Sequence, residues 1–226
     1  MGSTRLPGKS FIELEGKPSA QYIIESIKQL DKGIVKVLAT SDYEEDKVLF
    51  DFFKSNELEA FQGSQFNVAS RYAEIIKDYE LDFFFRIPGD TPLYDHRIIE
   101  KGLELLESVS YDIDFISSMP NRGYPMGMNL ELFNCSTFME NISEFDQDQD
   151  IEHVTSYFYR NLSKYSYQLV DCGLEGFKYE DYKFSIDTRE DLMDIRSLVG
   201  FLEKPHFEYD FSDLCKFYKL INSKTK

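Results

Sequence analysis

Hydrophobic and polar positions follow two different periods along the chain. Short apolar runs, typical of strands buried in a parallel sheet, lie between longer stretches in which apolar residues recur at helical spacing. The runs predict strands at 33–40, 58–61, 82–87, 111–119, 167–172 and 182–188. The helical spacing predicts helices at 19–30, 43–55, 95–108, 188–202 and 211–221, and a further one that begins at 67, while the acidic residues at 146–150 predict a solvated loop. This alternation predicts an α/β fold with a doubly wound, mostly parallel sheet and an antiparallel excursion in its second half.

Small polar residues and a carboxylate follow three of the predicted strands. Thr40 and Ser41 end the first of them, Gly63 and Ser64 come after the second, and Asp90 follows the third. Open α/β sheets bind their ligands at the carboxyl ends of the strands, so these side chains are candidates for one site. For Ser41 a second interpretation stays open, in which it caps the next helix.

The turn that carries Asp90 contains Gly89 between Pro88 and the carboxylate, and a second proline at 92. These residues force a tight bend that aims the Asp90 side chain off the end of the strand. Magnesium binds oxygen ligands, usually one or two carboxylates together with substrate phosphates. Asp90 is therefore a candidate magnesium ligand, although aspartate is also a common turn former.

Residues 1–9 form a glycine-rich loop with two cations, Arg5 and Lys9. Backbone N–H groups, the hydroxyls of Ser3 and Thr4, and both positive charges could face one polyanion such as a triphosphate, with Gly2 and the glycine at 8 allowing the turns. The alternative is a disordered N-terminus, which is common for segments of this composition.

The bulk composition narrows the function classes. A chain of 226 residues fits one domain, spanning 1–226, and a formal net charge of −16 argues against a nucleic-acid or anionic-membrane partner. If the substrate is a nucleotide, a few cationic side chains and a metal ion would have to neutralise the charge of its phosphates. The three cysteines show no metal or disulfide spacing, which favours free thiols in a reducing compartment. With no apolar run of membrane-spanning length and no signal peptide, we expect a cytoplasmic protein.

The stretch Gly2-Ser3-Thr4-Arg5-Leu6-Pro7-Gly8-Lys9 resembles the opening signature of the sugar cytidylyltransferases, which include acylneuraminate and octulosonate enzymes, and the resemblance is closest to the SpsF type of the spore-coat polysaccharide branch. It continues through five segments, namely Gly63-Ser64 with Arg71-Tyr72, Arg86-x-x-Gly89-Asp90, Tyr124-Pro125-x-Gly127 with Glu131-x-Phe133, Glu152-His153-Val154-Thr155, and Asp187-Thr188-x-x-Asp191-Leu192. Three positions depart from the pattern. Gln62 and Asn67 replace the usual Arg and Asp, which bears on base selectivity, and Ile151 replaces an Arg.

The resemblance implies a Rossmann-like three-layer α/β/α nucleotidyltransferase fold. It also implies a reaction in which a hydroxyl of a sugar acid, such as a nonulosonate, attacks the α-phosphorus of CTP and releases pyrophosphate, for surface polysaccharide or glycan synthesis. It implies catalytic roles for Arg5 and Lys9 on the β- and γ-phosphates. Asp90 and Asp187 would share a Mg²⁺ ion, whereas Asp191 is interpreted as N-terminal helix charge. The nucleotide contacts it implies are Gly2, Ser3, Arg5, Lys9, Thr40, Ser41, Gly63, Ser64 and Arg71, and the acceptor contacts are Gly127, Glu131, Glu152 and His153.

Alternatives accompany these roles. Gly127 and Glu131 could belong to an ordinary turn and strand, and a His beside a Glu on a helix is more often a structural pair than a catalytic one. A nucleotide-binding homologue without turnover and a nucleotide-sugar-dependent glycosyltransferase are the competing functions. A homodimer is compatible with the resemblance but is not specified by it.

Relatives of this kind carry an apolar strand directly before the phosphate loop, and the printed sequence has no such strand ahead of Gly2. Because that strand is usually central in a doubly wound sheet, we expect its absence to lower stability and activity. The corresponding expectation is that about ten further residues upstream, roughly one strand length plus the loop arginine, would raise both the melting temperature and the affinity for CTP.

Overall fold

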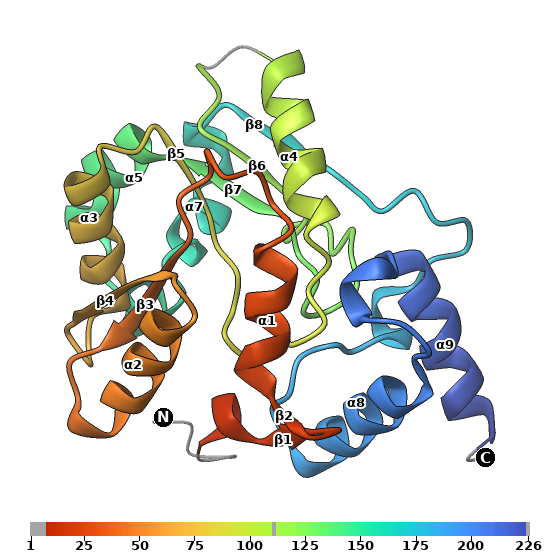
Figure 1. Cartoon of the computed structure of the whole chain (residues 1–226). Coiled ribbons are helices and arrows are strands. Elements are labelled where there is room, and N and C mark those ends of the chain that lie inside the picture. Colours follow the sequence, from red (N-terminus) through yellow and green to blue (C-terminus); the bar gives the residue numbers. More distant parts are fainter. Residues whose placement is uncertain (1–7, 110–111, 225–226) are drawn as a thin grey trace.

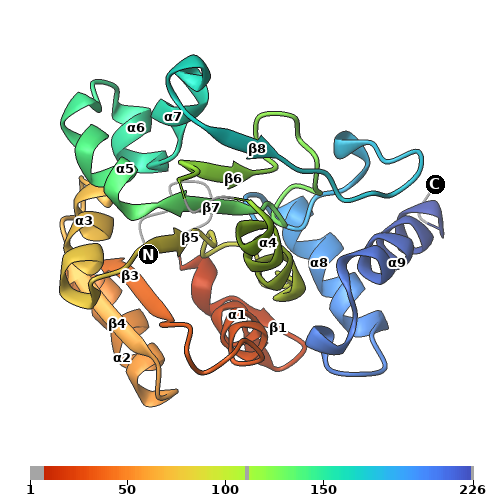
Figure 2. The same cartoon turned by 90° about the horizontal axis from the view of Figure 1, so that it is seen from above.

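The computed structural model describes residues 8–109 and 112–224, which form three layers with helices on both faces of β-structure (Figures 1 and 2). The strands are β1 (Glu13–Leu14), β2 (Lys17–Pro18), β3 (Val37–Ser41), β4 (Glu59–Gly63), β5 (Phe83–Phe85), β6 (Phe115–Ser117), β7 (Glu131–Asn134) and β8 (Tyr167–Leu169). The α-helices are α1 (Ser19–Ile27), α2 (Lys47–Ser55), α3 (Val68–Tyr79), α4 (Arg97–Ser108), α5 (Cys135–Asn141), α6 (Asp148–His153), α7 (Ser156–Arg160), α8 (Arg189–Phe201) and α9 (Phe211–Lys224). The short 3₁₀ helices are η1 (Lys9–Phe11), η2 (Glu44–Asp46), η3 (Ile142–Glu144), η4 (Leu162–Lys164), η5 (Tyr179–Asp181) and η6 (His206–Glu208).

The longer strands form two sheets. β3 and β4 pair in parallel, from Val37 opposite Glu59 to Ser41 opposite Gly63. The other sheet has the order β5-β7-β6-β8, in which β7 is antiparallel to both of its neighbours and β8 is parallel to β6. The antiparallel strand confirms the excursion predicted for the second half. Helices α1, α2 and α4 cover one face, and α3, α5, α6 and α7 cover the other (Figure 2).

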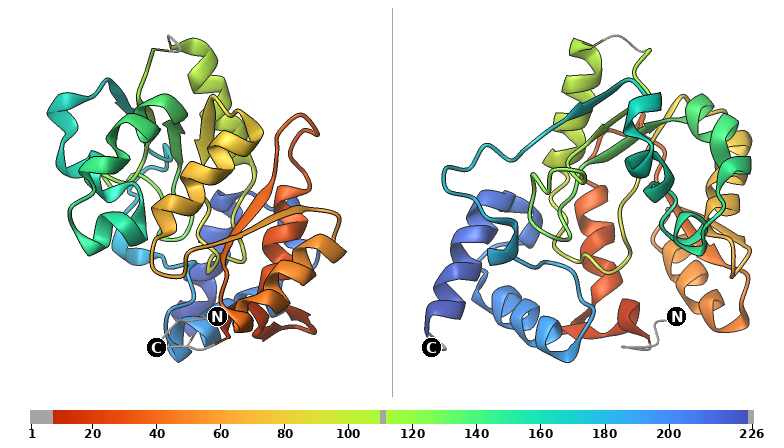
Figure 3. Two further views of the ribbon diagram at one scale, coloured as in Figure 1. Left: turned by 90° about the vertical axis from the view of Figure 1, so that its left-hand side faces the viewer. Right: turned by 180° about the vertical axis from the view of Figure 1, so that it is seen from behind.

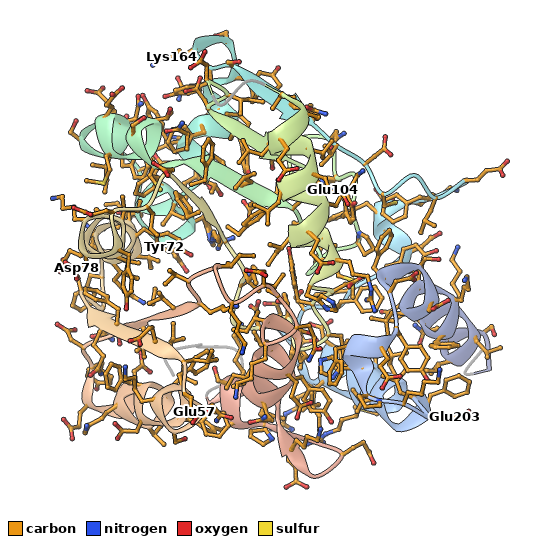
Figure 4. All side chains as sticks on the ribbon, turned by 45° about the horizontal axis from the view of Figure 1, so that its top comes forward. Glu57, Tyr72, Asp78, Glu104, Lys164 and Glu203 are labelled. Atoms are coloured by element: carbon orange, nitrogen blue, oxygen red, sulfur yellow. The ribbon has the colours of Figure 1, made fainter. Side chains whose placement is uncertain are left out.

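Two hydrophobic clusters lie on the two sides of the sheets. The first surrounds α1, which is buried on almost every side, with Ile24 fully buried. The second is mainly aromatic and lies under α3 and α5 to α7. In it the rings of Phe115 and Phe133 stack 5.0 Å apart, and Tyr72 of α3 (Figure 4) packs against Phe84 at 5.2 Å. Five buried phenylalanines belong to this second cluster, namely Phe84, Phe115, Phe133, Phe138 and Phe158.

The C-terminal helices form a separate corner of the molecule. α8 and α9 pack side by side, away from the β3–β4 pair (Figure 3). Asp95, at the start of α4, holds this corner by accepting a hydrogen bond from the backbone N–H of Phe211 over 2.8 Å. The Arg97 guanidinium also donates hydrogen bonds to the carbonyl oxygens of Phe207 and Tyr209.

Two expectations from the sequence were wrong. Residues 182–188 do not form a strand, because this segment runs extended beside residue 126 and makes a single parallel bridge, from Met126 to Lys183. Residues 146–150 are not simply a solvated acidic loop: α6 begins inside them, and the Asp150 carboxylate is fully buried. Both of its oxygens accept hydrogen bonds from the guanidinium of Arg160, one of them over 2.7 Å.

Among the described residues, no helix combines the length and the apolar character needed to cross a bilayer. The thiols of Cys135, Cys172 and Cys215 are all free, as expected from their spacing. Burial raises the pKa of Cys135 and of Cys215 to about 12, so both behave as core residues rather than as nucleophiles.

Candidate active site

Lys9 joins two carboxylates that are far away in the sequence. Its ammonium nitrogen lies 2.5 Å from Oδ2 of Asp90 and 4.0 Å from Oδ1 of Asp187. The same nitrogen lies 3.5 Å from the carbonyl oxygen of Ile186. Three of the four predicted catalytic residues therefore meet at one point, while the fourth, Arg5, lies outside the described residues together with Gly2 and Ser3.

Local structure positions each of these groups. Gly8 adopts a left-handed conformation with φ of 70° just before η1, which turns the chain so that Lys9 points inward. Thr91 closes the turn after β5 by donating its hydroxyl to the carbonyl oxygen of Pro88 over 2.7 Å, and this fixes Asp90 beside it. The sequence predicted this turn from Gly89 and the prolines at 88 and 92.

Asp187 is held by the start of α8. Thr188 caps the helix, and Asp191 completes a capping box. Oδ2 of Asp191 accepts the backbone N–H groups of Asp187 at 2.9 Å and of Thr188 at 2.8 Å. The sequence assigned Asp191 to the helix terminus rather than to the metal, and the geometry agrees with that assignment.

Lys183 is a member of the site that the sequence did not suggest. Its ammonium lies 3.1 Å from Oδ2 of Asp187 and 2.6 Å from Oδ2 of Asp191. Burial lowers the pKa of Lys183, but its hydrogen bonds to Asp191 and Asp187 outweigh this effect and leave the pKa above its ordinary value. The apolar pattern of 182–188 predicts a strand. In a strand the side chains of residues 183 and 187 would not meet, so the pattern gave no indication of this contact.

Thr40, Ser41 and Gly63 lie at the carboxyl ends of β3 and β4, where Ser41 is in register with Gly63. The Ser41 hydroxyl donates a short hydrogen bond to the carboxylate of Asp46, at the start of α2. Neither η2 nor α2 has a side-chain cap, so the helix-capping interpretation of Ser41 was wrong, and its hydroxyl bonds to a carboxylate instead. A Cβ on Gly63 would come within 2.7 Å of the Phe61 ring, which explains the need for glycine there.

Arg71 anchors the loop that follows β4. Its guanidinium donates to the carbonyl oxygens of Ser64 at 2.8 Å, Ala39 at 3.1 Å and Gln65 at 3.4 Å. Burial lowers the pKa of Arg71, and the charge of Asp46 opposes this effect. In this structure Arg71 joins the ends of β3 and β4 through the main chain, so any contact with a nucleotide would be additional to that positioning role.

The same loop uses the other polar positions noted in the sequence. The Ser64 hydroxyl accepts the backbone N–H of Asn67 at 3.1 Å, and the Asn67 side chain caps α3 by accepting the N–H of Ser70 at 2.8 Å. Gln62 donates to the carbonyl oxygen of Ser41 over 3.3 Å. The two departures from the family pattern, Gln62 and Asn67, are therefore both accommodated by local hydrogen bonds.

Gly127 brings the predicted acceptor segment against the loop that carries Asp187. It has φ of 90°, and a Cβ there would lie 2.7 Å from the backbone nitrogen of Ser185. The approach is completed by the N–H of Phe184, which donates to the carbonyl oxygen of Met126 over 2.8 Å. Glycine is required here by a left-handed conformation and by a close main-chain contact together.

Glu131 is the centre of a buried polar network. One carboxylate oxygen accepts from Arg86 of the loop after β5 at 2.9 Å, and the other accepts from the hydroxyls of Thr155 and Tyr159 at 2.8 Å each. The Tyr159 hydroxyl also lies 2.8 Å from that of Ser117. Burial alone would lower the pKa of Arg86, but the nearby Glu131 charge raises it above its ordinary range. Burial, reinforced by Glu131, raises the pKa of Tyr159.

Glu152 and His153 end α6 with exposed side chains. The next two residues of the same motif point inward: Val154 is fully buried with φ of 34°, and Thr155 donates to Glu131. The motif is therefore divided, with its first half on the surface and its second half tied to β7. The Glu131 carboxylate accepts a hydrogen bond from Thr155, and none of its contacts given above involves Glu152 or His153.

Residues 1–216 match the cytidylyltransferase family. The chain belongs to this family. A cytidylyltransferase from Leptospira borgpetersenii serovar Hardjo-bovis superposes with a TM-score of 0.88 at 26% identity, over 99% of this chain and 92% of that one. The spore coat polysaccharide biosynthesis protein SpsF of Bacillus subtilis is 28% identical over 205 residues, which cover 88% of this chain and 82% of SpsF. A CMP:2-keto-3-deoxy-manno-octonic acid synthetase complexed with CTP shares the fold, with a TM-score of 0.63 and 17% identity over 88% of this chain and 94% of that one.

These similarities establish the expected Rossmann-like nucleotidyltransferase fold, and they place the cluster of Lys9, Asp90 and Asp187 in a cytidylyltransferase. Lys9 in η1, Asp90 in the turn after β5 and Asp187 just ahead of α8 thus meet at the end of the sheet where β5 finishes. Parallel α/β sheets bind ligands at that end.

Proposed function

We propose that this cytidylyltransferase transfers the cytidylyl group of CTP to a hydroxyl of a sugar acid and releases pyrophosphate, as a step in making a surface polysaccharide or glycan. The observation that carries the proposal is the convergence of Lys9 with Asp90 and Asp187 at the end of the sheet. The family match supports the use of CTP. The names of SpsF and of the octonic acid synthetase support a sugar acid and a polysaccharide role.

In this reaction a bond forms between the acceptor oxygen and the α-phosphorus while the bond from that phosphorus to the β-phosphate oxygen breaks. Lys9 would hold the phosphates that leave as pyrophosphate, with Arg5 as its partner in the same loop. Phosphoryl-type transfer depends mainly on positioning and on neutralising charge, which one ammonium and one guanidinium at a loop can supply.

The two carboxylates fit a magnesium ion. Their side chains are only 21% and 23% exposed, and both face the Lys9 ammonium, so the space between them already favours a positive charge. No group of three or more His, Cys, Asp or Glu that could hold a metal occurs in residues 8–109 and 112–224, so the remaining ligands would come from the phosphates and water. When bound, magnesium would neutralise charge on the α-phosphate and lower the pKa of the acceptor hydroxyl. Asp90 and Asp187 would hold it.

A pyrophosphate-release assay tests the proposal. The chain is incubated with magnesium and each of CTP, UTP, GTP and ATP against a panel of sugar acids that includes octulosonates and nonulosonates. We expect release with CTP and at least one sugar acid, with formation of the matching CMP-sugar. Tight CTP binding without pyrophosphate release would favour a nucleotide-binding protein without turnover. Release of a nucleotide from a ready-made nucleotide sugar would favour a glycosyltransferase.

A further inference from the structure

Lys183 lies on a segment that the main chain holds in place. It forms a parallel bridge with Met126, and the N–H of Phe184 donates to the carbonyl oxygen of Met126 over 2.8 Å. Gly127 has no Cβ and so allows this close approach. At the other end of the segment, Asp187 precedes α8, and the capping box of that helix accepts its backbone N–H. The ammonium of Lys183 and the carboxylate of Asp187 therefore meet between two fixed points.

The two oxygens of the Asp187 carboxylate have different neighbours. Oδ2 lies 3.1 Å from the ammonium nitrogen of Lys183 and accepts the hydroxyl of Ser185 over 3.3 Å. Oδ1 lies 4.0 Å from the ammonium nitrogen of Lys9. Because that ammonium also contacts Asp90, Oδ1 is the oxygen directed toward the candidate magnesium site.

Lys183 has a second anchor in Asp191. Its ammonium nitrogen lies 2.6 Å from Oδ2 of Asp191, the same oxygen that accepts the backbone N–H groups of Asp187 and Thr188. One carboxylate oxygen thus joins the side chain of Lys183 to the main chain that carries Asp187. The side chains of Lys183 and Asp191 are only 29% and 13% exposed, so water and salt screen this pair less than an exposed one.

The positive charge of Lys183 balances two carboxylates at once, those of Asp187 and Asp191. With a neutral side chain at this position, the two carboxylates would repel each other. The Asp187 side chain could then rotate, and both of its oxygens could turn toward a bound cation. Lys183 therefore restricts which oxygen of Asp187 a metal ion can reach.

Magnesium and calcium differ in how they use a carboxylate. Magnesium demands a nearly octahedral arrangement with short distances, whereas calcium takes more oxygen ligands in a flexible arrangement and can bind both oxygens of one carboxylate. Two donors on Oδ2 of Asp187, from Lys183 and Ser185, compete with a metal ion for that oxygen. A carboxylate held in this way suits magnesium better than calcium.

We propose that Lys183 is a positioning residue that makes the site select magnesium over calcium. It holds Oδ2 of Asp187 and presents Oδ1 alone to the metal, so that Asp187 is a monodentate ligand. This inference rests on the proposed function, because it takes Asp90 and Asp187 as the magnesium ligands.

The experiment measures the affinity for CTP by isothermal titration, once in excess Mg²⁺ and once in excess Ca²⁺, with no sugar present. The readout is the ratio of the two affinities, because losing a positive charge beside the site changes the attraction of both cations in the same direction. Lys183→Met should lower the preference for magnesium by at least about fivefold. The matched control is Lys101→Met, which breaks an exposed pair with Glu104 and should leave the ratio unchanged.

Lys183→Gln covers the case in which the methionine variant does not fold, because it keeps a polar side chain at this position. It should also lower the ratio, since a neutral amide does not balance two carboxylates. The melting temperature of each variant shows whether it is folded under the conditions of the titration.

An unchanged ratio in a folded Lys183 variant would overturn the proposal, and so would equal CTP affinities with the two metals in the unchanged chain. Equal losses of CTP affinity with both metals would also overturn it and would assign Lys183 to the phosphates. Pyrophosphate release by the unchanged chain together with any of these results keeps the proposed function and rejects only the inference. If the unchanged chain binds CTP equally well with and without a divalent cation, both the inference and the magnesium role of Asp90 and Asp187 are wrong.

Discussion

The backbone N–H of Ile186 donates to the carbonyl oxygen of Asp90 over 2.8 Å. This hydrogen bond joins two loops that are almost a hundred residues apart in the sequence, and it does so through main-chain atoms directly beside the two candidate magnesium ligands. The separation of Asp90 and Asp187 is therefore set by the backbone. Changes of their side chains should alter the chemistry of the site without moving the loops.

Asp90→Asn and Asp187→Asn should each lower turnover by at least about a hundredfold at saturating magnesium, because a neutral amide neither balances Lys9 nor binds a hard cation as a carboxylate does. Their melting temperatures should stay close to that of the unchanged chain. Asp51→Asn, which removes an exposed carboxylate paired with Lys47, is the matched control. Turnover near the control level in both variants would contradict the assignment.

Lys9→Ala should weaken binding of CTP far more than binding of CMP, because CMP lacks the β- and γ-phosphates that the ammonium would hold. Isothermal titration of both nucleotides measures the difference. Lys17→Ala removes a lysine from an exposed pair with Glu25 and should change neither affinity. Equal losses for CTP and CMP would place Lys9 away from the terminal phosphates.

Glu131→Gln should lower the free energy of unfolding by about 3 to 5 kcal/mol, because the buried Arg86 guanidinium loses its counter-charge. Urea denaturation measures this value. The matched control is Glu59→Gln, which breaks an exposed pair with Lys54 and should leave the free energy of unfolding almost unchanged. An unchanged unfolding free energy combined with a higher KM for the sugar would instead assign Glu131 to acceptor binding.

His206 should make stability depend on pH. Its ring is buried between α1 and η6, where it lies 2.9 Å from the carbonyl oxygen of Tyr22 and 3.1 Å from the Ser26 hydroxyl. Burial lowers the pKa of His206 from 6.5 to about 4, against the opposing charge of Glu25. The unfolded chain therefore binds this proton more tightly than the folded chain.

The stabilisation by neutral His206 is fully present above pH 6.5 and is lost as the pH falls from 6.5 toward 4, by about 3 kcal/mol in total. Urea denaturation at pH 7 and pH 4.5 should show a smaller difference in His206→Gln than in the unchanged chain. His153→Gln, at an exposed position, should retain the full difference. If both variants show the same pH dependence, the buried ring is not its source.

The sequence predicted most of the longer helices and strands because they carry a regular apolar period, but it did not predict α5 or α7. It predicted Asp90 and Asp187 as partners through the family motifs, and the structure brings both to Lys9. Most of the strands are shorter than predicted: β5, for example, covers Phe83–Phe85 out of an apolar run of 82–87, whereas β4 extends to Gly63, beyond the predicted 58–61. The apolar pattern extends beyond the residues whose backbones pair between strands, because their neighbours along the chain also pack into the core.

Other features could not be predicted because they depend on distant partners. The acidic neighbours of Asp150 predict a solvated side chain. Its carboxylate is buried instead because the guanidinium of Arg160, on the next helix, balances its charge. The segment that contains Lys183 has the composition of a strand, but it lies where Gly127 approaches it and pairs at one position only. In both cases tertiary contacts override the local pattern.

The three hydrogen bonds from Arg71 to carbonyl oxygens have a consequence for how freely the loop after β4 tolerates substitution. Because the path of the loop after β4 is set by main-chain contacts from below, its outward side chains are free to vary without refolding the loop. Gln65 and Phe66, the latter 85% exposed, are such positions. The side chains of this loop can thus be exchanged while its main chain, anchored by Arg71, stays in place.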